Sequence, residues 1–216
     1  FDPLILTDEI DINNLLNKIE NIGNSLHGFT EKLVFSFADI AAYRKVKLNL
    51  TKSGINYKEW NELQMNEFAN RLKEMNMQWG YQLATCGEQI DIEKYGISHN
   101  RCVDDDLMIR LAHDDSELMK FLKIEVKTRE NTLFGEAKIP PGAILIDGSR
   151  YGIKAKNNRD TGQRQFCGCI KSKDIGEYNT CPHQCEYCYA NASKQAAAMN
   201  YKSHKNNLWS ETITGK

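Results

Sequence analysis

Three cysteines near the C-terminal end have the spacing of a reactive metal site. Cys181, Cys185 and Cys188 follow the pattern C-x3-C-x2-C on one short stretch. Three thiolates are one fewer than the four cysteines that fill a cubane iron–sulfur cluster, so a [4Fe-4S] cluster held here keeps one iron without a protein ligand. An open coordination position distinguishes a reactive metal site from a closed structural one. The spacing therefore predicts chemistry in which a small molecule is the fourth ligand.

Three other interpretations of this stretch remain open. Cys185 and Cys188 alone form a C-x2-C pair, which is also the pattern of a thioredoxin-like redox motif. Zinc is the stronger alternative, because His183 adds a fourth tetrahedral ligand, although its spacing from Cys181 is tighter than usual. The three cysteines could also be unrelated buried side chains. We expect an iron–sulfur cluster in preference to all three.

The remaining four cysteines raise the question of a second metal site, because four thiolates close either another cluster or a zinc site. Cys167 and Cys169 place two thiolates on one turn, and Cys102 lies in a predicted loop. Cys86 is expected at the carboxyl end of a strand. The hypothesis is an auxiliary [4Fe-4S] centre that relays electrons or binds substrate, with zinc as an alternative. The simpler alternative is that these four are ordinary buried cysteines.

Composition restricts the possible partners. The 216-residue chain has a formal net charge of −1, so no overall field attracts nucleic acid or an anionic membrane. No apolar run approaches the roughly 20 residues of a membrane span. The cysteine count is odd and no secretory signal is visible, which favours metal binding in the reducing cytoplasm over a disulfide framework. We expect no membrane or nucleic-acid partner.

The first part of the chain has the pattern of repeating βα units. Apolar residues recur at helical spacing over 12–26 and 65–75, and buried-strand runs occupy 32–37 and 81–85. Alternation of this kind predicts a parallel sheet covered by helices, with functional groups beyond the carboxyl ends of its strands. Ser36, Asp39, Cys86 and Glu88 follow these strands. Glu88 is a candidate contact for a cofactor amine, and a helix cap is the alternative.

The later segments are less regular. We expect a helix over 104–123 that begins at the acidic run 104–106, strands over 124–128 and 143–146, and a solvated basic loop over 148–165. A strand over 172–180 and a helix over 191–200 would flank the C-terminal cysteines, followed by a frayed polar tail. These predictions divide the chain into a βα part (1–123), a loop-rich insertion (124–166), a cysteine-rich segment (167–201) and a tail (202–216).

The cysteine stretch carries a resemblance. C-x3-C-x-aromatic-C between a strand and a helix resembles the cluster motif of the radical S-adenosylmethionine (radical SAM) enzymes. The resemblance implies that Cys181, Cys185 and Cys188 hold a [4Fe-4S] cluster whose open iron binds SAM, with Tyr187 near the adenine. It also implies an electron donor such as a flavodoxin or ferredoxin. Nothing in the sequence selects the substrate.

A narrower resemblance covers most of the chain. Its landmarks are Phe-Asp-Pro at 1–3, Val-Phe-Ser-Phe at 34–37, Thr-Cys-Gly-Glu at 85–88, Tyr-Gly-Ile at 95–97, Cys-Gly-Cys at 167–169, Asp-Ile-Gly-Glu-Tyr-Asn-Thr at 174–180 and Cys-Glu-Tyr-Cys-Tyr-Ala-Asn at 185–191. Together they resemble the bacterial family called domain of unknown function 1848, which carries radical-SAM-like cysteines at its C-terminal end.

This resemblance shapes the expected fold and function. The expected fold class is α/β, with a partial parallel (β/α) barrel-like sheet of the radical SAM type. The order of its units would be circularly permuted and its N-terminal part missing, and residues 114–156 are longer than the family pattern. The expected function is a radical SAM enzyme. The alternative is a metal-stabilised redox or structural module, with zinc or an iron–sulfur cluster, that performs no SAM chemistry.

Overall fold

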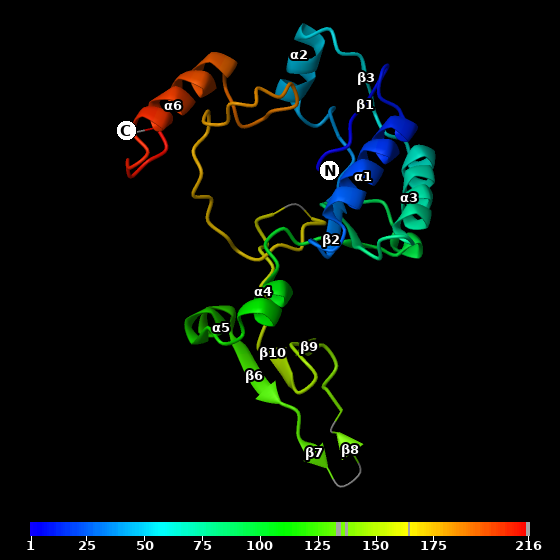
Figure 1. Ribbon diagram of the computed structural model, residues 1–216, viewed down its shortest axis with the longest axis vertical. Helices are drawn as coiled ribbons and strands as arrows, with labels where there is room; N and C mark the ends of the chain where they lie inside the picture. The colour runs from blue at the N-terminus through cyan, green and yellow to red at the C-terminus, as the bar shows by residue number, and fades with distance from the viewer. Residues whose placement is uncertain (133–134, 137, 164, 215–216) are drawn as a thin grey trace. The chain divides into compact units, whose positions relative to one another are not determined.

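The computed structural model describes residues 1–132, 135–136, 138–163 and 165–214, and the chain forms two compact units. Unit 1 contains residues 1–84, 90–98 and 173–216, and unit 2 contains residues 85–89 and 99–172. Unit 1 therefore combines the blue and red ends of the chain in Figure 1, and unit 2 is green to yellow. These units cut across the four segments suggested by the sequence.

Unit 1 is built from βα segments. A three-stranded sheet has the order β2-β4-β5, and a separate antiparallel pair joins β1 to β3. Helices α1 and α3 pack against each other beside this sheet (Figure 1). The elements are β1 (Leu6–Thr7), α1 (Ile12–Leu26), β2 (Lys32–Phe35), α2 (Arg44–Lys52), β3 (Tyr57–Lys58), α3 (Glu62–Asn76), β4 (Gln82–Thr85), the 3-10 helix η1 (Glu93–Tyr95), β5 (Ile97–His99) and α6 (Lys194–Asn206).

Local sequence explains where the two long helices begin. The Asp11 side chain accepts a hydrogen bond from the backbone of Asn14, whose side chain accepts one from the backbone of Asp11, forming a capping box. Asn61 and Gln64 repeat this arrangement at the start of α3. The predicted helix over 12–26 is confirmed, and the helix predicted around 65–75 is α3.

The core of unit 1 is aromatic and aliphatic. Phe35, Phe37, Trp60 and Phe68 lie with ring centroids 4.7–5.8 Å apart, mostly edge to face. The buried faces of α1 and α3 complete this core, so the apolar spacing read from the sequence corresponds to the buried face. The core therefore holds the strand ends, and the residues that follow them, in fixed positions.

The class of the fold is mixed α/β with small sheets. Leu4 and Phe37 form an isolated parallel bridge beside β2. No sheet closes into a barrel within the described ranges, and the partial radical SAM barrel remains a prediction. No helix in the same ranges is long and apolar enough to cross a membrane.

Unit 2 contains a small antiparallel sheet with two short helices. Strand β10 lies between β6 and β9, and its register pairs Arg150 with Thr128 and Lys154 with Ile124. Ile109, Met119, Leu122 and Ile170 form the buried core of this unit. The elements are α4 (Asp105–Ala112), α5 (Ser116–Leu122), β6 (Ile124–Thr128), β7 (Asn131–Thr132), β8 (Gly135–Glu136), β9 (Ile144–Leu145) and β10 (Arg150–Lys154).

Two predictions for this region were wrong in detail. The helix expected over 104–123 is two helices, because the Asp115 side chain accepts from the backbone N–H of Leu118 at 2.9 Å and begins α5 anew. The loop expected over 148–165 contains β10. The cations of this segment suggested a solvated loop rather than a strand. The central residue of the strand, Gly152, is buried against Ile109, where a Cβ would come within 2.9 Å of the isoleucine side chain.

The segment before the C-terminal cysteines also differs from its prediction. Residues 172–180 are irregular rather than a strand, with a turn at 178–179, and the Thr180 hydroxyl donates to the carbonyl of Glu177 at 2.7 Å. Helix α6 begins at Lys194 with Ser193 as its N-cap and continues to Asn206. The tail after Lys202 was expected to be frayed, but its first four residues belong to this helix.

Candidate metal centres

The C-terminal cysteine loop is held by one asparagine. Asn191 donates through Nδ2 to the carbonyl of Cys181 at 2.9 Å, and its backbone N–H donates to Sγ of Cys188 at 3.3 Å. The N–H of Cys188 donates in turn to the carbonyl of Cys185 at 3.1 Å. Asn191 therefore ties the first and third cysteines of the motif together. The cysteine spacing did not predict this role, although Asn191 ends the sequence landmark at 185–191.

Helix α2 anchors the same loop. Lys45 donates through Nζ to the carbonyl of Tyr189 at 3.1 Å and to the carbonyl of Asn191. Tyr187 packs against an apolar cluster formed by α2 and the residues before it: Ala38, Ile40, Val46 and Leu50. These contacts join segments about 140 residues apart, which no local pattern could have predicted.

A cavity of about 290 Å³ lies between α2 and the cysteine loop. Cys185 and Cys188 line it together with Lys45, Lys52 and Asn191. Asn191 is only 7% exposed, and its Oδ1 has no hydrogen-bond partner among the described residues. An unpaired buried acceptor costs roughly 1–3 kcal/mol, so Oδ1 of Asn191 leaves an unmet hydrogen bond in the wall of this cavity.

The Tyr187 hydroxyl lies in an environment that keeps it neutral. Burial raises its pKa above the ordinary value, and the nearby Tyr43 and the carboxylates of Asp2, Asp39 and Glu59 raise it further. Asp2 also accepts a hydrogen bond from the hydroxyl of Ser36, beside the end of β2. The ring is therefore placed next to the carboxyl ends of the βα units, where functional groups were expected.

The spacing of the thiols bears on the choice between zinc and a cluster. Within the described residues, Asp104, Asp105 and Asp106 are the one set of three or more His, Cys, Asp or Glu ligand atoms that all lie within 4.8 Å of one another. The three C-terminal thiols are therefore spread more widely. Tetrahedral zinc with 2.3 Å bonds places its sulfur ligands ~3.8 Å apart. A cubane distributes its cysteines over separate irons, so a [4Fe-4S] cluster needs wider sulfur separations than zinc does.

The other four cysteines are brought together in unit 2. Sγ of Cys86 lies 3.5 Å from Sγ of Cys102. Sγ of Cys169 accepts from the backbone N–H of Cys102 at 3.1 Å and of Val103 at 3.5 Å. Burial opposes ionisation of Cys169, but hydrogen bonds from Val103, Cys167 and Cys102 outweigh it and lower the pKa of its thiol. No disulfide joins any of the seven cysteines.

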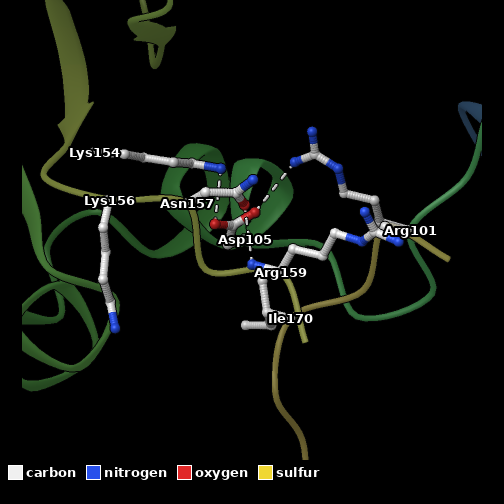
Figure 2. Close-up of a pocket in the computed structure, with 8 residues that line it drawn as sticks. Arg101, Asp105, Lys154, Lys156, Asn157, Arg159 and Ile170 are labelled. Atoms are coloured by element: carbon white, nitrogen blue, oxygen red, sulfur yellow. Dashed lines mark hydrogen bonds and ion pairs between the residues drawn. The ribbon is translucent and has the colours of Figure 1, made fainter. Parts of the chain in front are cut away.

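A charged cavity of about 440 Å³ adjoins this cysteine group (Figure 2). Asp105 lies in it with its side chain 2% exposed, 3.2 Å from Nη1 of Arg101 and 2.7 Å from Nζ of Lys154. Burial opposes ionisation of this carboxyl, but the bonds from Lys154 and Asn158 outweigh it and lower its pKa. The acidic run 104–106 thus begins α4 and pairs with two cations, as expected of a helix start.

The two candidate cofactor contacts fall in different units. Glu88 belongs to unit 2, next to Gly87 with its left-handed φ of 69° after Cys86. Tyr187 belongs to unit 1 with the C-terminal cysteines. Asp39, expected beside them, accepts from the N–H of Ala42 at 3.2 Å and so shapes the turn after its strand.

These features define a mixed α/β protein with three cysteines on a C-terminal loop and four grouped in a second compact unit. A family model described as Domain of unknown function (DUF1848) matches residues 1–190, and the chain belongs to this family. The match includes all seven cysteines. No curated protein and no solved structure matched the chain.

Proposed function

We propose that this chain is an iron–sulfur protein of the radical SAM type. Cys181, Cys185 and Cys188 would hold a [4Fe-4S] cluster with one iron open to SAM. A cluster bound there would supply one electron to SAM, whose bond between sulfur and C5′ would break to give methionine and a 5′-deoxyadenosyl radical. The observation that carries the proposal is the cavity against Cys185 and Cys188, which Lys45, Lys52 and Asn191 also line.

The residues of the chain would bind and orient the small molecule. Oδ1 of Asn191 offers an acceptor for an ammonium group, and Lys45 and Lys52 offer positive charge for a carboxylate. SAM carries both groups on its methionine part. Tyr187 stays neutral and offers an aromatic face, which supports a role near the adenine.

The reaction would need partners outside this chain. A one-electron donor such as a flavodoxin or ferredoxin would reduce the cluster, and the substrate is unknown. A partial (β/α) barrel would place the substrate beyond the carboxyl ends of its strands.

A second candidate function rests on a different observation. The 3.5 Å separation of the Cys86 and Cys102 sulfurs is compact enough for a closed metal site, which favours a metal-stabilised module without SAM chemistry. The two candidates differ in whether SAM is cleaved.

The decisive experiment uses anaerobically reconstituted protein. We expect about four irons per chain, a change in the electron paramagnetic resonance spectrum of the reduced cluster on adding SAM, and release of 5′-deoxyadenosine. Cys185→Ser should lose the iron and the product. Cys102→Ser is the matched control, because it changes a cysteine of the other group and should keep both. Full iron content and full SAM cleavage in Cys185→Ser would refute the proposal.

A further inference from the structure

We propose that Cys86, Cys102, Cys167 and Cys169 bind one zinc ion as a closed structural site in unit 2. The proposal does not depend on SAM chemistry at the C-terminal loop. It assigns a different metal to the four cysteines for which the sequence suggested an auxiliary cluster.

The sulfur separation favours a single ion. Four thiolates around one zinc lie ~3.8 Å apart, because the bonds are about 2.3 Å long and tetrahedral. Sγ of Cys86 and Sγ of Cys102 are 3.5 Å apart, close to this value. Cysteines of a cubane bind four different irons and must stand further from one another. No three of these sulfurs lie all within 4.8 Å of one another in the described residues, so metal binding would close the group on one side.

The backbone already brings the three cysteine segments together. The N–H of Asn100 donates to the carbonyl of Thr85 at 2.7 Å, which aligns the chain around Cys86 with the chain around Cys102. The N–H of Ile170 donates to the carbonyl of Val103 at 3.1 Å, which aligns the Cys169 segment with them. These bonds involve no metal. They bring the four cysteines into one region before any metal binds, so metal binding would have less of the chain to order.

The sulfur of Cys169 has the surroundings of a thiolate ligand. It is 9% exposed, and two backbone N–H groups point at it, from Cys102 at 3.1 Å and Val103 at 3.5 Å. Hydrogen bonds to ligand atoms orient and tune metal sites. The ordinary alternative of four buried cysteines fails, because Cys102 is exposed and Cys86 and Cys167 are only partly buried.

Arg159 would offset part of the charge of the site, whereas Arg101 and Lys154 already pair with Asp105. Four thiolates and one Zn²⁺ carry a net charge of −2. Arg101 precedes a ligand directly, and Arg159 donates through Nε to the carbonyl of Cys167 at 2.8 Å. Both arginines line the cavity of Figure 2 with Lys154 and Lys156. A Cβ on Gly168, between two ligands, would approach Cγ of Arg101 to 3.0 Å, so glycine admits the arginine there.

Metal analysis of the purified full chain tests the proposal. We expect about one zinc per chain, bound with or without reconstituted iron. Cys102→Ser should lose most of it, and this exposed position should tolerate serine. Cys185→Ser is the control and should retain the zinc. Cobalt substitution should give the absorption of a tetrahedral tetrathiolate site in the wild type and in Cys185→Ser, but not in Cys102→Ser.

Three outcomes would overturn the zinc assignment. They are four irons per chain retained by Cys185→Ser, zinc retained by Cys102→Ser and by Cys169→Ser alike, and wild-type protein that binds neither zinc nor cobalt. Circular dichroism of each variant would identify loss of folding. If Cys169→Ser unfolds, Cys86→Ser gives the same test at a partly buried position. None of these results depends on whether SAM is cleaved.

Discussion

Asn191 is the residue that connects the cysteine loop to the cavity beside it. Its Nδ2 holds the carbonyl of Cys181, its N–H holds Sγ of Cys188, and its Oδ1 is buried without a partner. One amide thus organises two of the three proposed cluster ligands, and its residue lines the cavity beside Cys185 and Cys188.

Replacing this amide should weaken the loop. Asn191→Ala is expected to cost about 1 kcal/mol of unfolding free energy and to lower both the iron retained after reconstitution and the affinity for SAM. Asn200→Ala is the matched control, because it removes a similar 2.9 Å bond from Nδ2 to the carbonyl of Asn179 in the same unit. Urea unfolding, iron analysis and SAM titration are the measurements. Equal iron loss in the two variants would contradict the role assigned to Asn191.

Asp105 is the charged residue on which the cavity of unit 2 depends. Asp105→Asn should cost about 3 kcal/mol, because Lys154 and Arg101 would lose their buried partner. The pKa of this carboxyl is lowered, so its contribution is full above the ordinary value near 3.9 and is lost as pH falls through the lower folded-state pKa. The difference between wild type and variant should therefore persist at neutral pH and shrink in strong acid.

A matched control uses an exposed pair in the same unit. Glu125→Gln removes a carboxylate that is 3.3 Å from Lys127 and 68% exposed, and the change should stay within about 0.5 kcal/mol. Urea unfolding at several pH values measures both variants. A difference for Asp105→Asn that grows in acid would reverse the assigned sign.

At the scale of elements, the packing of α1 depends on one small residue. A Cβ on Gly23 would come within 2.7 Å of the Trp79 ring, so α1 can approach only because the residue is glycine. Next to this contact, Nε1 of Trp79 donates a hydrogen bond to Oδ1 of Asn24 on α1 at 2.7 Å. Glycine has a low helix propensity, and its presence at position 23 inside α1 is explained by the close packing of Trp79.

Gly23→Ala should destabilise unit 1 by about 1–3 kcal/mol, because overpacking outweighs the helix propensity gained, about 1 kcal/mol. Asn17→Ala, on the exposed face of the same helix, should be neutral or slightly stabilising. Denaturant unfolding compares the two. A more stable Gly23→Ala variant would show that Trp79 moves aside at no cost.

Periodicity predicted some elements and not others. Apolar spacing predicted α1 and α3, because both bury one face in a single core. It missed β10, where Arg150 and Lys154 stand on either side of the buried Gly152, and it placed a strand at 172–180, where the chain is irregular. A local pattern is informative only where one face is buried along its whole length.

At the scale of the whole molecule, the chain crosses between its two units more than once. Residues 85–89 and 99–172 come together in unit 2, so the proposed zinc ligands come from segments far apart in the sequence. A metal held there would stabilise unit 2, to which all four of its ligands belong.

Removal of that metal should therefore act locally. A chelator is expected to increase amide hydrogen exchange in residues 99–112 and 158–170, while α1 and α3 keep their protection. Exchange measured by mass spectrometry, with and without added zinc, checks this. A uniform increase across both units, or no change in either, would contradict a structural zinc in unit 2.

The sequence by itself determined the chemical inventory: a three-cysteine motif, four further cysteines and two strongly periodic helices. These are local properties of residue type and spacing. Short sequence landmarks also indicated the family called domain of unknown function 1848, and the family match over residues 1–190 supports this assignment. Tertiary structure alone decided which groups meet. Cys86 contacts Cys102, Cys102 contacts Cys169, and Lys45 contacts the cysteine loop. Burial and hydrogen bonds bring these segments together, and residue spacing along the sequence does not predict contacts between distant segments.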